Sequence, residues 1–187
     1  MKYTLTDKVK VIDGVTLHRI KALRSFGYVR AGDLGGWVER EANLSQDGDA
    51  WVYGDAWVFG DAWVYGTAWV YGDAMVCGNA QVSGNAQVFG NAKVSGDARV
   101  SENAKVYGDA RVFGNAKVYG DAMVCGDAWV CGDAWLFGDA WVYGDARVSG
   151  DARVSGDARV SEPKTTKPWS RDNEPGNFPK LEQKRQI

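Results

Sequence analysis

Most of this chain consists of repeats of one six-residue motif. From Gly48 to Ser161 the sequence repeats Gly-Asp/Asn-Ala-x-Val-x in nineteen consecutive copies without losing register. The valine recurs at every sixth position from Val52 to Val160, and Leu136 is the one departure. A short fixed period of this kind indicates a repeat architecture, in which each unit buries its apolar face only by stacking on its neighbours.

The six-residue motif itself predicts a short strand followed by a corner. In residues 50–53, Ala-Trp-Val-Tyr, small and aliphatic side chains alternate with aromatic ones, which is the period-two signature of a strand with one buried face. Ala and Val are therefore expected to point inward, and Trp51 and Tyr53 outward. Gly54-Asp55 then supplies a turn, because glycine reaches positive φ without steric cost and Asp tolerates it. Repeated without pause, strand and corner wind into a solenoid.

Hexads with an aliphatic residue and a small residue two positions earlier resemble the left-handed parallel β-helix, in which three hexads make one triangular turn. The resemblance covers roughly residues 37–161. It implies an all-β fold whose hand is an exception to the usual right-handed crossover. A right-handed β-helix is the alternative, although its turns are usually longer and less regular.

The chain divides into three expected parts. Residues 1–36 lie outside the repeat and predict an N-terminal β cap, with a hairpin around an Asp13-Gly14 turn. Residues 37–161 form the β-helix, in which Gln46-Asp47 inserts two residues before the regular register begins. Residues 162–187 hold all four prolines and predict a polar tail, either disordered or docked on the solenoid.

The junction carries a second resemblance. Residues 29–38, with Gly35-Gly36-Trp37, and residues 43–53, with Leu44-Ser45-Gln46, resemble the entry segment of the YdcK-like family. These are bacterial and phage-borne β-helix proteins of largely unassigned function. The resemblance implies a non-catalytic scaffold or binding module, such as a phage accessory protein that binds a host protein.

Sorting the outward positions by a period of eighteen residues gives three faces, of which one is the richest in aromatic residues. Its members are the candidate binding residues Trp51, Tyr53, Trp69, Tyr71, Phe89, Tyr107, Trp141 and Tyr143. Aromatic ladders of this kind can serve only to stabilise neighbouring strands. They can also mark an interaction surface, because Trp and Tyr are enriched at binding hot spots. The expected partner is a protein or a second copy of the chain, which would give a homo-oligomer.

The sequence offers little for catalysis. Many hexapeptide β-helices are acyltransferases that use a histidine base beside a loop interrupting the coil. The single histidine here, His18, lies in the predicted hairpin, and no loop breaks the period between Val52 and Val160. One carboxylate per coil at the corners does not supply the six oxygens that calcium needs. We therefore expect no catalytic, cofactor or metal site, with an acyltransferase as the alternative.

The net charge and the cysteines of the chain indicate which partners and which cellular compartment to expect. The formal net charge is −2, and Arg147, Arg153 and Arg159 fall on three different faces, which disfavours nucleic-acid binding. No apolar run suits a membrane span or a signal peptide. The three cysteines, expected to point outward, are too far apart for a disulfide, which favours a reducing compartment and hence the cytoplasm.

Overall fold

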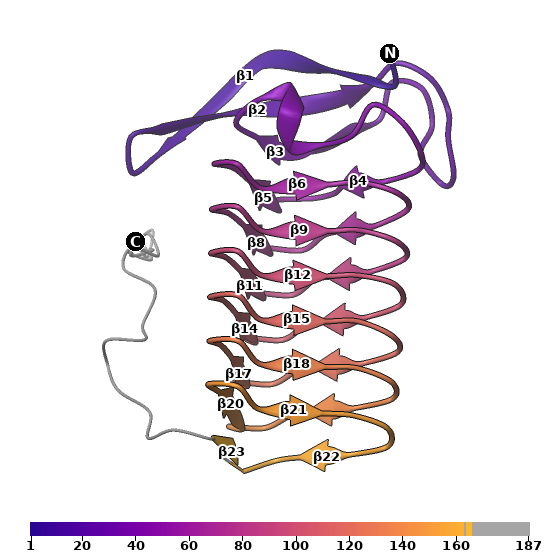
Figure 1. Cartoon of the computed structure of the whole chain (residues 1–187). Coiled ribbons are helices and arrows are strands. Elements are labelled where there is room, and N and C mark those ends of the chain that lie inside the picture. The colour runs from indigo at the N-terminus through magenta and orange to yellow at the C-terminus, as the bar shows by residue number, and fades with distance from the viewer. Residues whose placement is uncertain (163, 166–187) are drawn as a thin grey trace, which may run out of the picture.

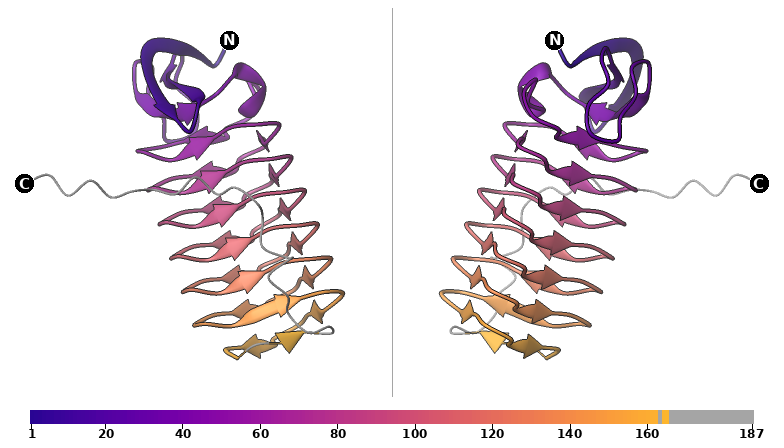
Figure 2. Two further views of the ribbon diagram at one scale, coloured as in Figure 1. Left: turned by 90° about the vertical axis from the view of Figure 1, so that its left-hand side faces the viewer. Right: turned by 90° about the vertical axis from the view of Figure 1, so that its right-hand side faces the viewer.

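The computed structural model describes residues 1–162 and 164–165. These residues form a parallel β-solenoid of stacked coils, closed at its N-terminal end by an antiparallel hairpin (Figures 1 and 2). Within them there is no α-helix, only one short 3-10 helix, η1 (Glu41–Asn43). The predicted all-β solenoid is confirmed, while the left-handed sense stays a prediction. The predicted polar tail lies outside the described residues, apart from its first positions.

Each full coil contributes one short strand to each of three sheets. The first sheet runs from the hairpin to the last coil through β1 (Tyr3–Ile12), β2 (Val15–Ala22), β3 (Leu34–Val38), β5 (Trp57–Val58), β8 (Met75–Val76), β11 (Lys93–Val94), β14 (Arg111–Val112), β17 (Trp129–Val130), β20 (Arg147–Ser149) and β23 (Lys164–Thr165). The second contains β4 (Trp51–Val52), β7 (Trp69–Val70), β10 (Gln87–Val88), β13 (Lys105–Val106), β16 (Met123–Val124), β19 (Trp141–Val142) and β22 (Arg159–Val160). The third contains β6 (Trp63–Val64), β9 (Gln81–Val82), β12 (Arg99–Val100), β15 (Lys117–Val118), β18 (Trp135–Leu136) and β21 (Arg153–Val154).

The backbone hydrogen bonds of the strands run between coils. The N–H of Trp69 donates to the carbonyl of Ala86 at 2.9 Å and that of Tyr71 to Val88 at 3.0 Å, and this pattern recurs along the prism. Strand partners are eighteen residues apart, as in the pairing of β7 with β10. At the junction Trp37 pairs with Trp57 instead, a separation longer by two residues. The difference matches the predicted insertion at Gln46-Asp47.

The interior is a column of Ala and Val. The repeated alanines and valines of the full coils are almost completely buried, and Leu136 takes the place of one valine. At about 1.5 kcal/mol or more for each fully buried valine, the column is the main favourable term. No coil could gain it alone, because each inner side chain is covered by the coils above and below.

The corners need glycine because the coils approach closely there. A Cβ at Gly120 would lie 2.8 Å from the backbone nitrogen of Gly138, and the residue has a φ of +72°. Glu102 is the one departure among the repeat glycines, with a φ of +61°. Its carboxylate accepts a hydrogen bond from the N–H of Gly120 at 2.8 Å, which offsets part of the strain.

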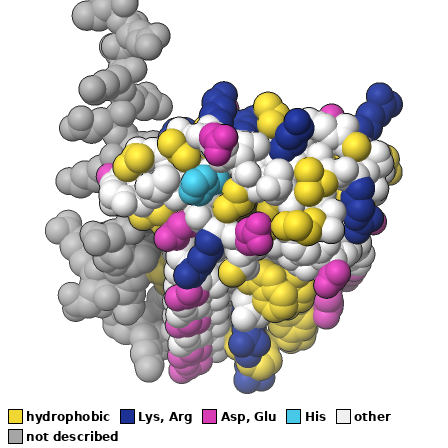
Figure 3. Space-filling view, turned by 90° about the horizontal axis from the view of Figure 1, so that it is seen from above, with side chains coloured by type: hydrophobic (Ala, Val, Ile, Leu, Met, Phe, Trp, Pro, Cys, Tyr) yellow, Lys and Arg dark blue, Asp and Glu magenta, His cyan; other side chains and the backbone are white. Residues whose placement is uncertain are grey.

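Asn side chains separate many of the acidic ones along the corners. The Asn91 amide donates to the Asp109 carboxylate at 2.9 Å, and Asn115 donates to Asp133 in the same way. Such bonds replace repulsion between stacked carboxylates with attraction. Figure 3, a view from the cap end, shows acidic side chains stacked at one corner. Nowhere in the described residues do three or more His, Cys, Asp or Glu side chains gather so that they could hold a metal ion.

The hairpin β1–β2 lies over the first coil, with Asp13 and Gly14 both at positive φ in its turn. Buried Tyr3 fixes it, because its hydroxyl lies within hydrogen-bond distance of the carbonyls of Glu41 and Leu44, at 2.8 and 2.7 Å. The Gln46 side chain accepts from the N–H of Lys2 at 2.7 Å. Gln46, one of the two inserted residues, therefore connects the cap to the first coil.

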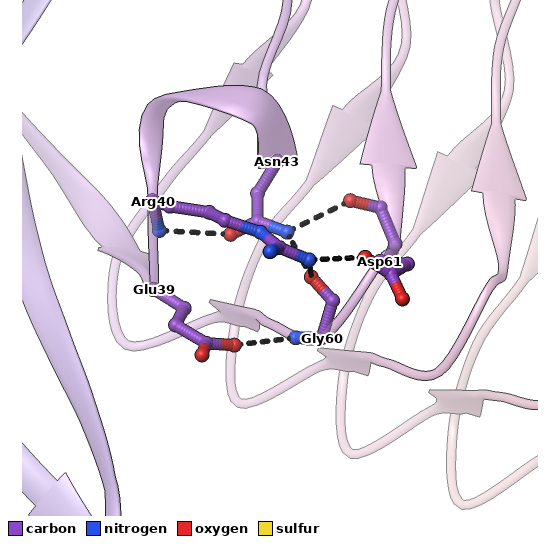
Figure 4. Close-up of polar contacts among 6 residues, drawn as sticks. Glu39, Arg40, Asn43, Gly60 and Asp61 are labelled. Carbon is purple, nitrogen blue, oxygen red and sulfur yellow. Dashed lines mark hydrogen bonds and ion pairs between the residues drawn. The ribbon is translucent and has the colours of Figure 1, made fainter.

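A polar cluster finishes the irregular first coil (Figure 4). Buried Asn43 donates from its amide to the carbonyls of Gly60 and Ala62, each at 2.9 Å. Glu39 accepts from the N–H of Gly60 at 2.7 Å, and Arg40 pairs with Asp61. These side chains satisfy backbone groups of the next coil that a regular hexad would pair through its own backbone.

Replacing Val106 with Asp should abolish cooperative folding or lower the free energy of unfolding by at least about 4 kcal/mol, because it places an unpaired charge in the Val/Ala column. Val106 has no exposed surface. Urea denaturation followed by circular dichroism measures the effect. Val11→Asp, in the hairpin at a valine that is 65% exposed, is the matched control and should change stability little. Equal loss in both variants would contradict the buried column.

Candidate functional site

An aromatic hollow lies where the cap meets the second sheet. Its volume is about 710 Å³, and it is lined by Tyr28, Tyr53, Trp69 and Tyr71. Tyr28 comes from the loop between β2 and β3, and the other three from the first two strands of the second sheet and the residues that follow them. The hollow therefore joins the irregular part of the chain to the repeat.

The loop presents Tyr28 because its neighbours are anchored. Phe26 and Val29 exchange backbone hydrogen bonds at 3.0 and 2.8 Å, which leaves Gly27 and Tyr28 at the tip of a tight turn. Phe26 and Val29 are buried, and the Phe26 ring meets the Trp51 ring edge-on with centroids 5.3 Å apart. Tyr28 is 83% exposed. Its ring nevertheless stands perpendicular to Trp69, at 87° and 5.5 Å.

The aromatic surface continues from the hollow down the second sheet. Tyr53 meets Trp69 edge-on at 5.8 Å. Tyr71 stacks on Phe89 at 4.7 Å, and Phe89 on Tyr107 at 4.9 Å, with ring planes parallel to within 3°. These centroid distances match the spacing of paired strands, so the coil pitch itself sets the stack. We call Tyr28, Tyr53, Trp69, Tyr71, Phe89 and Tyr107 the aromatic surface.

Two of the predicted binding residues lie apart from it. The stack ends at Cys125, whose sulfur accepts a hydrogen bond from the indole N–H of Trp141 at 3.2 Å. Trp141 and Tyr143 contact each other at 5.1 Å, and Arg159 lies 5.3 Å from the Trp141 ring. The structure therefore joins Tyr53, Trp69, Tyr71, Phe89 and Tyr107 and places the other pair farther down the prism.

The expectation that Trp51 is outward and open to a partner is wrong. Its side chain leaves the coil outward, but the cap covers it and no surface remains exposed. Its ring contacts Tyr3 and Phe26 edge-on. A Cβ at Gly35 would lie 2.6 Å from the indole, so β3 also presses on it. The first coil needs this cover because it has no coil above it.

The cysteines are less accessible than their predicted outward positions suggest. Cys77, Cys125 and Cys131 are unpaired, as predicted, but all three are buried between side chains of their own sheets. Burial raises the pKa of Cys77 to about 11. Burial also raises the pKa of Cys131, so the thiols of Cys77 and Cys131 are protonated at neutral pH and poorly placed to react.

Tyr28 is the site residue that sequence analysis missed. It lies outside the repeat, where no periodicity assigns it a face. The local pattern Phe26-Gly27-Tyr28-Val29 indicates a turn, because glycine separates two apolar residues. Nothing in that pattern indicates that the turn folds over Trp69, which is a contact across forty-one positions of the chain.

Two tyrosine hydroxyls of the hollow, those of Tyr53 and Tyr71, stay protonated at neutral pH. Burial, together with the Asp33 carboxylate, raises the pKa of Tyr53, and burial raises that of Tyr71. The side chain of Asp49 lies beside Gly27, within 4 Å of the position where a Cβ would stand. The hollow is thus apolar and aromatic, with carboxylates near its rim.

His18, the alternative catalytic residue, lies in β2 and pairs with Val38 across the sheet. It is half-buried, and its Nδ1 lies 3.3 Å from the backbone oxygen of Thr6. In the described residues no carboxylate is hydrogen-bonded to its ring to orient it as a base. Nor do the described residues include a helix able to cross a membrane.

This architecture defines a β-solenoid repeat protein with an aromatic surface beside its cap. The family model described as "YdcK Beta solenoid repeat" matches residues 68–84, 80–102, 116–132 and 146–162. These segments resemble YdcK β-solenoid repeats, which confirms the resemblance to that family, in the regular coils rather than at the junction of residues 29–53. A protein named "Uncharacterized acetyltransferase YdcK", from Escherichia coli strain K12, is 38% identical over 60 residues. That alignment covers 28% of this chain and 18% of the relative.

Stability should depend on pH through Lys2, which lies beneath the Tyr28 loop. Its ammonium donates to the Ala50 carbonyl at 2.8 Å and lies 5.1 Å from the Phe26 ring. Burial lowers the pKa of Lys2 to about 8, from 10.5 for a free lysine. Between these values the unfolded chain binds the extra proton, so stability rises with pH.

The measurement is chemical denaturation of the parent and of Lys2→Met at pH 7 and pH 10. Because the variant lacks this titration, the difference in unfolding free energy should shift in favour of the parent by about 2 kcal/mol over that range. Other groups, such as the Cys77 thiol, titrate in both proteins and cancel. A difference that does not change with pH would show that Lys2 is not desolvated.

Proposed function

We propose that this chain is a non-catalytic binding module that holds a partner protein on its aromatic surface. The observation that carries the proposal is Tyr28, a large side chain that is mostly exposed and is held over Trp69 by a buried anchor. A ring used only to stabilise the coil would be expected to lie flat within its ladder. Exposed aromatic groups on a rigid frame are typical of binding hot spots, because little side-chain freedom is lost on association.

The rigid frame supports this role. Apart from Tyr28 on its loop, the rings of the surface belong to or follow strands whose inner residues are fully buried. Of these strands, β7, β10 and β13 are paired on both sides, and β4 is the edge of the sheet. A surface that is ordered before binding loses less conformational entropy when a partner docks. The three cysteines are free, which supports a reducing compartment such as the cytoplasm as the place of action.

The proposal predicts a position-specific cross-link. A photoreactive benzoylphenylalanine at Tyr28 should give a covalent adduct on illumination in the host cell, because this side chain would lie inside the interface. Tyr119, half-buried on the third sheet, is the matched control and should give none. The products are resolved by gel and mass spectrometry. An adduct twice the mass of the chain identifies self-association, which is the competing form of the proposal.

Three results would count against the proposal. These are no adduct at position 28, equal adducts at both positions, and an adduct at 28 that survives Trp69→Lys/Tyr71→Lys. The double variant replaces two half-buried rings outside the Val/Ala column, so it should fold. Light scattering on parent and variant then separates a homo-oligomer, which the variant would dissociate, from a monomer that binds another protein.

An acyltransferase is the second candidate, favoured by the printed name of the Escherichia coli relative. On this alternative, His18 would be the general base. Acetyl-coenzyme A should then raise the melting temperature of the parent, and His18→Ala should remove the shift or the acetyl transfer that accompanies it. A parent whose melting temperature does not respond to acetyl-coenzyme A would retire this candidate.

A further inference from the structure

Several tryptophans of the prism are covered by cationic side chains from the coils above and below. Trp129 and Trp135 each lie between two such groups. The centroid distances are 5.0 and 4.9 Å from Arg111 and Arg147 to Trp129, and 4.4 and 5.0 Å from Lys117 and Arg153 to Trp135. A cation within about 6 Å of a Trp ring is attracted to its negative face. Each partner stands at the neighbouring strand position of the same sheet.

Trp69 occupies the same position on the second sheet but has different neighbours. Its strand partners are Trp51 and Gln87, and neither carries a charge. In the part of the chain that the structure describes, no Lys or Arg lies over its ring, and this includes the exposed Arg24 and Arg30 of the nearby loop. Its other contacts, with Tyr28 and Tyr53, are edge-on.

We propose that the hollow receives an arginine side chain from the partner protein. The inference rests on the proposed function and names the group that the aromatic surface recognises. Proteins bind organic cations on clustered aromatic rings, and four rings line this open hollow. The volume of about 710 Å³ exceeds what one guanidinium fills, so the hollow has room for residues beside the arginine as well.

Two further observations favour a cation and, among cations, arginine. Asp33 and Asp49 lie near the rim, so each is a candidate partner for a cation that enters, although the Tyr28 loop also carries the exposed Arg24 and Arg30. A planar guanidinium stacks on an aromatic face, which the compact, strongly hydrated ammonium of lysine does less well. Within this chain both kinds of cation lie over Trp rings, with arginine on both sides of Trp129 and Lys117 over Trp135, so the preference for arginine rests on its planar shape.

The test compares two peptides that differ in charge and hardly in shape. Acetyl-Gly-Arg-Gly-amide and its citrulline counterpart are titrated into the labelled full chain, and the indole N–H resonance of Trp69 is followed by NMR. Trp69→Phe assigns the resonance. The arginine peptide should shift it and bind at least about fivefold more tightly than the citrulline peptide. Trp69→Leu should remove the binding.

Trp135→Leu is the matched control, because that ring already lies between Lys117 and Arg153. It should leave peptide binding unchanged, and circular dichroism verifies that both Leu variants fold. Equal binding of the two peptides, no shift with either up to about 10 mM, or equal loss in both Leu variants would each overturn the inference. A cross-link from position 28 that persists in those cases leaves the proposed function standing, whereas loss of the cross-link removes both.

Discussion

The hydrogen bonds between residues eighteen positions apart are the interaction on which the rest of this structure depends. They fix the distance between coils, and with it the distance between every outward side chain and its counterparts above and below. Like positions must therefore stack. The chain uses three kinds of stack: rings on rings from Tyr71 to Tyr107, amides on carboxylates at the corners, and cations on Trp129 and Trp135. In each kind of stack, the side chains that the coil spacing holds close together attract one another.

The same fixed spacing between coils restricts where a binding site can form. Along the prism, side chains from successive coils run parallel, so they make flat ladders rather than enclosed spaces. Side chains can converge on one space only where a segment breaks the register of the coils, and the cap supplies such a segment. Its loop carries Tyr28 across the second sheet, while Phe26 and Trp51 below it form the buried support. The hollow therefore arises at the boundary between the repeat and the cap, where rings from the second sheet meet a ring from the cap loop.

The sequence predicted what is periodic. Inward Ala and Val, the corner glycines, the Asp13-Gly14 turn and the two-residue insertion at Gln46-Asp47 all follow from local steric rules and an unbroken count. The same count placed Tyr53, Trp69, Tyr71, Phe89 and Tyr107 on one face. It failed at Trp51 because solvent exposure depends on what lies above the first coil, a tertiary contact that no period encodes. Tyr28 was missed for the same reason, as its role depends on the path of a loop.

The change of residue type along one column explains why the hollow is open. From the cap downward, the column that contains Trp69 reads Trp51, Trp69, Gln87, Lys105. The cap covers the first of these, and the lysine stands two coils below the second. Had position 87 been arginine, its guanidinium would be expected to reach Trp69 as Arg147 reaches Trp129 from the coil below. With glutamine there, whose oxygen lies 3.4 Å from the Tyr71 hydroxyl, no cation from the coil below covers the ring, which lines the hollow with three tyrosines. The uncharged glutamine below Trp69 therefore leaves room for a cation from outside the chain.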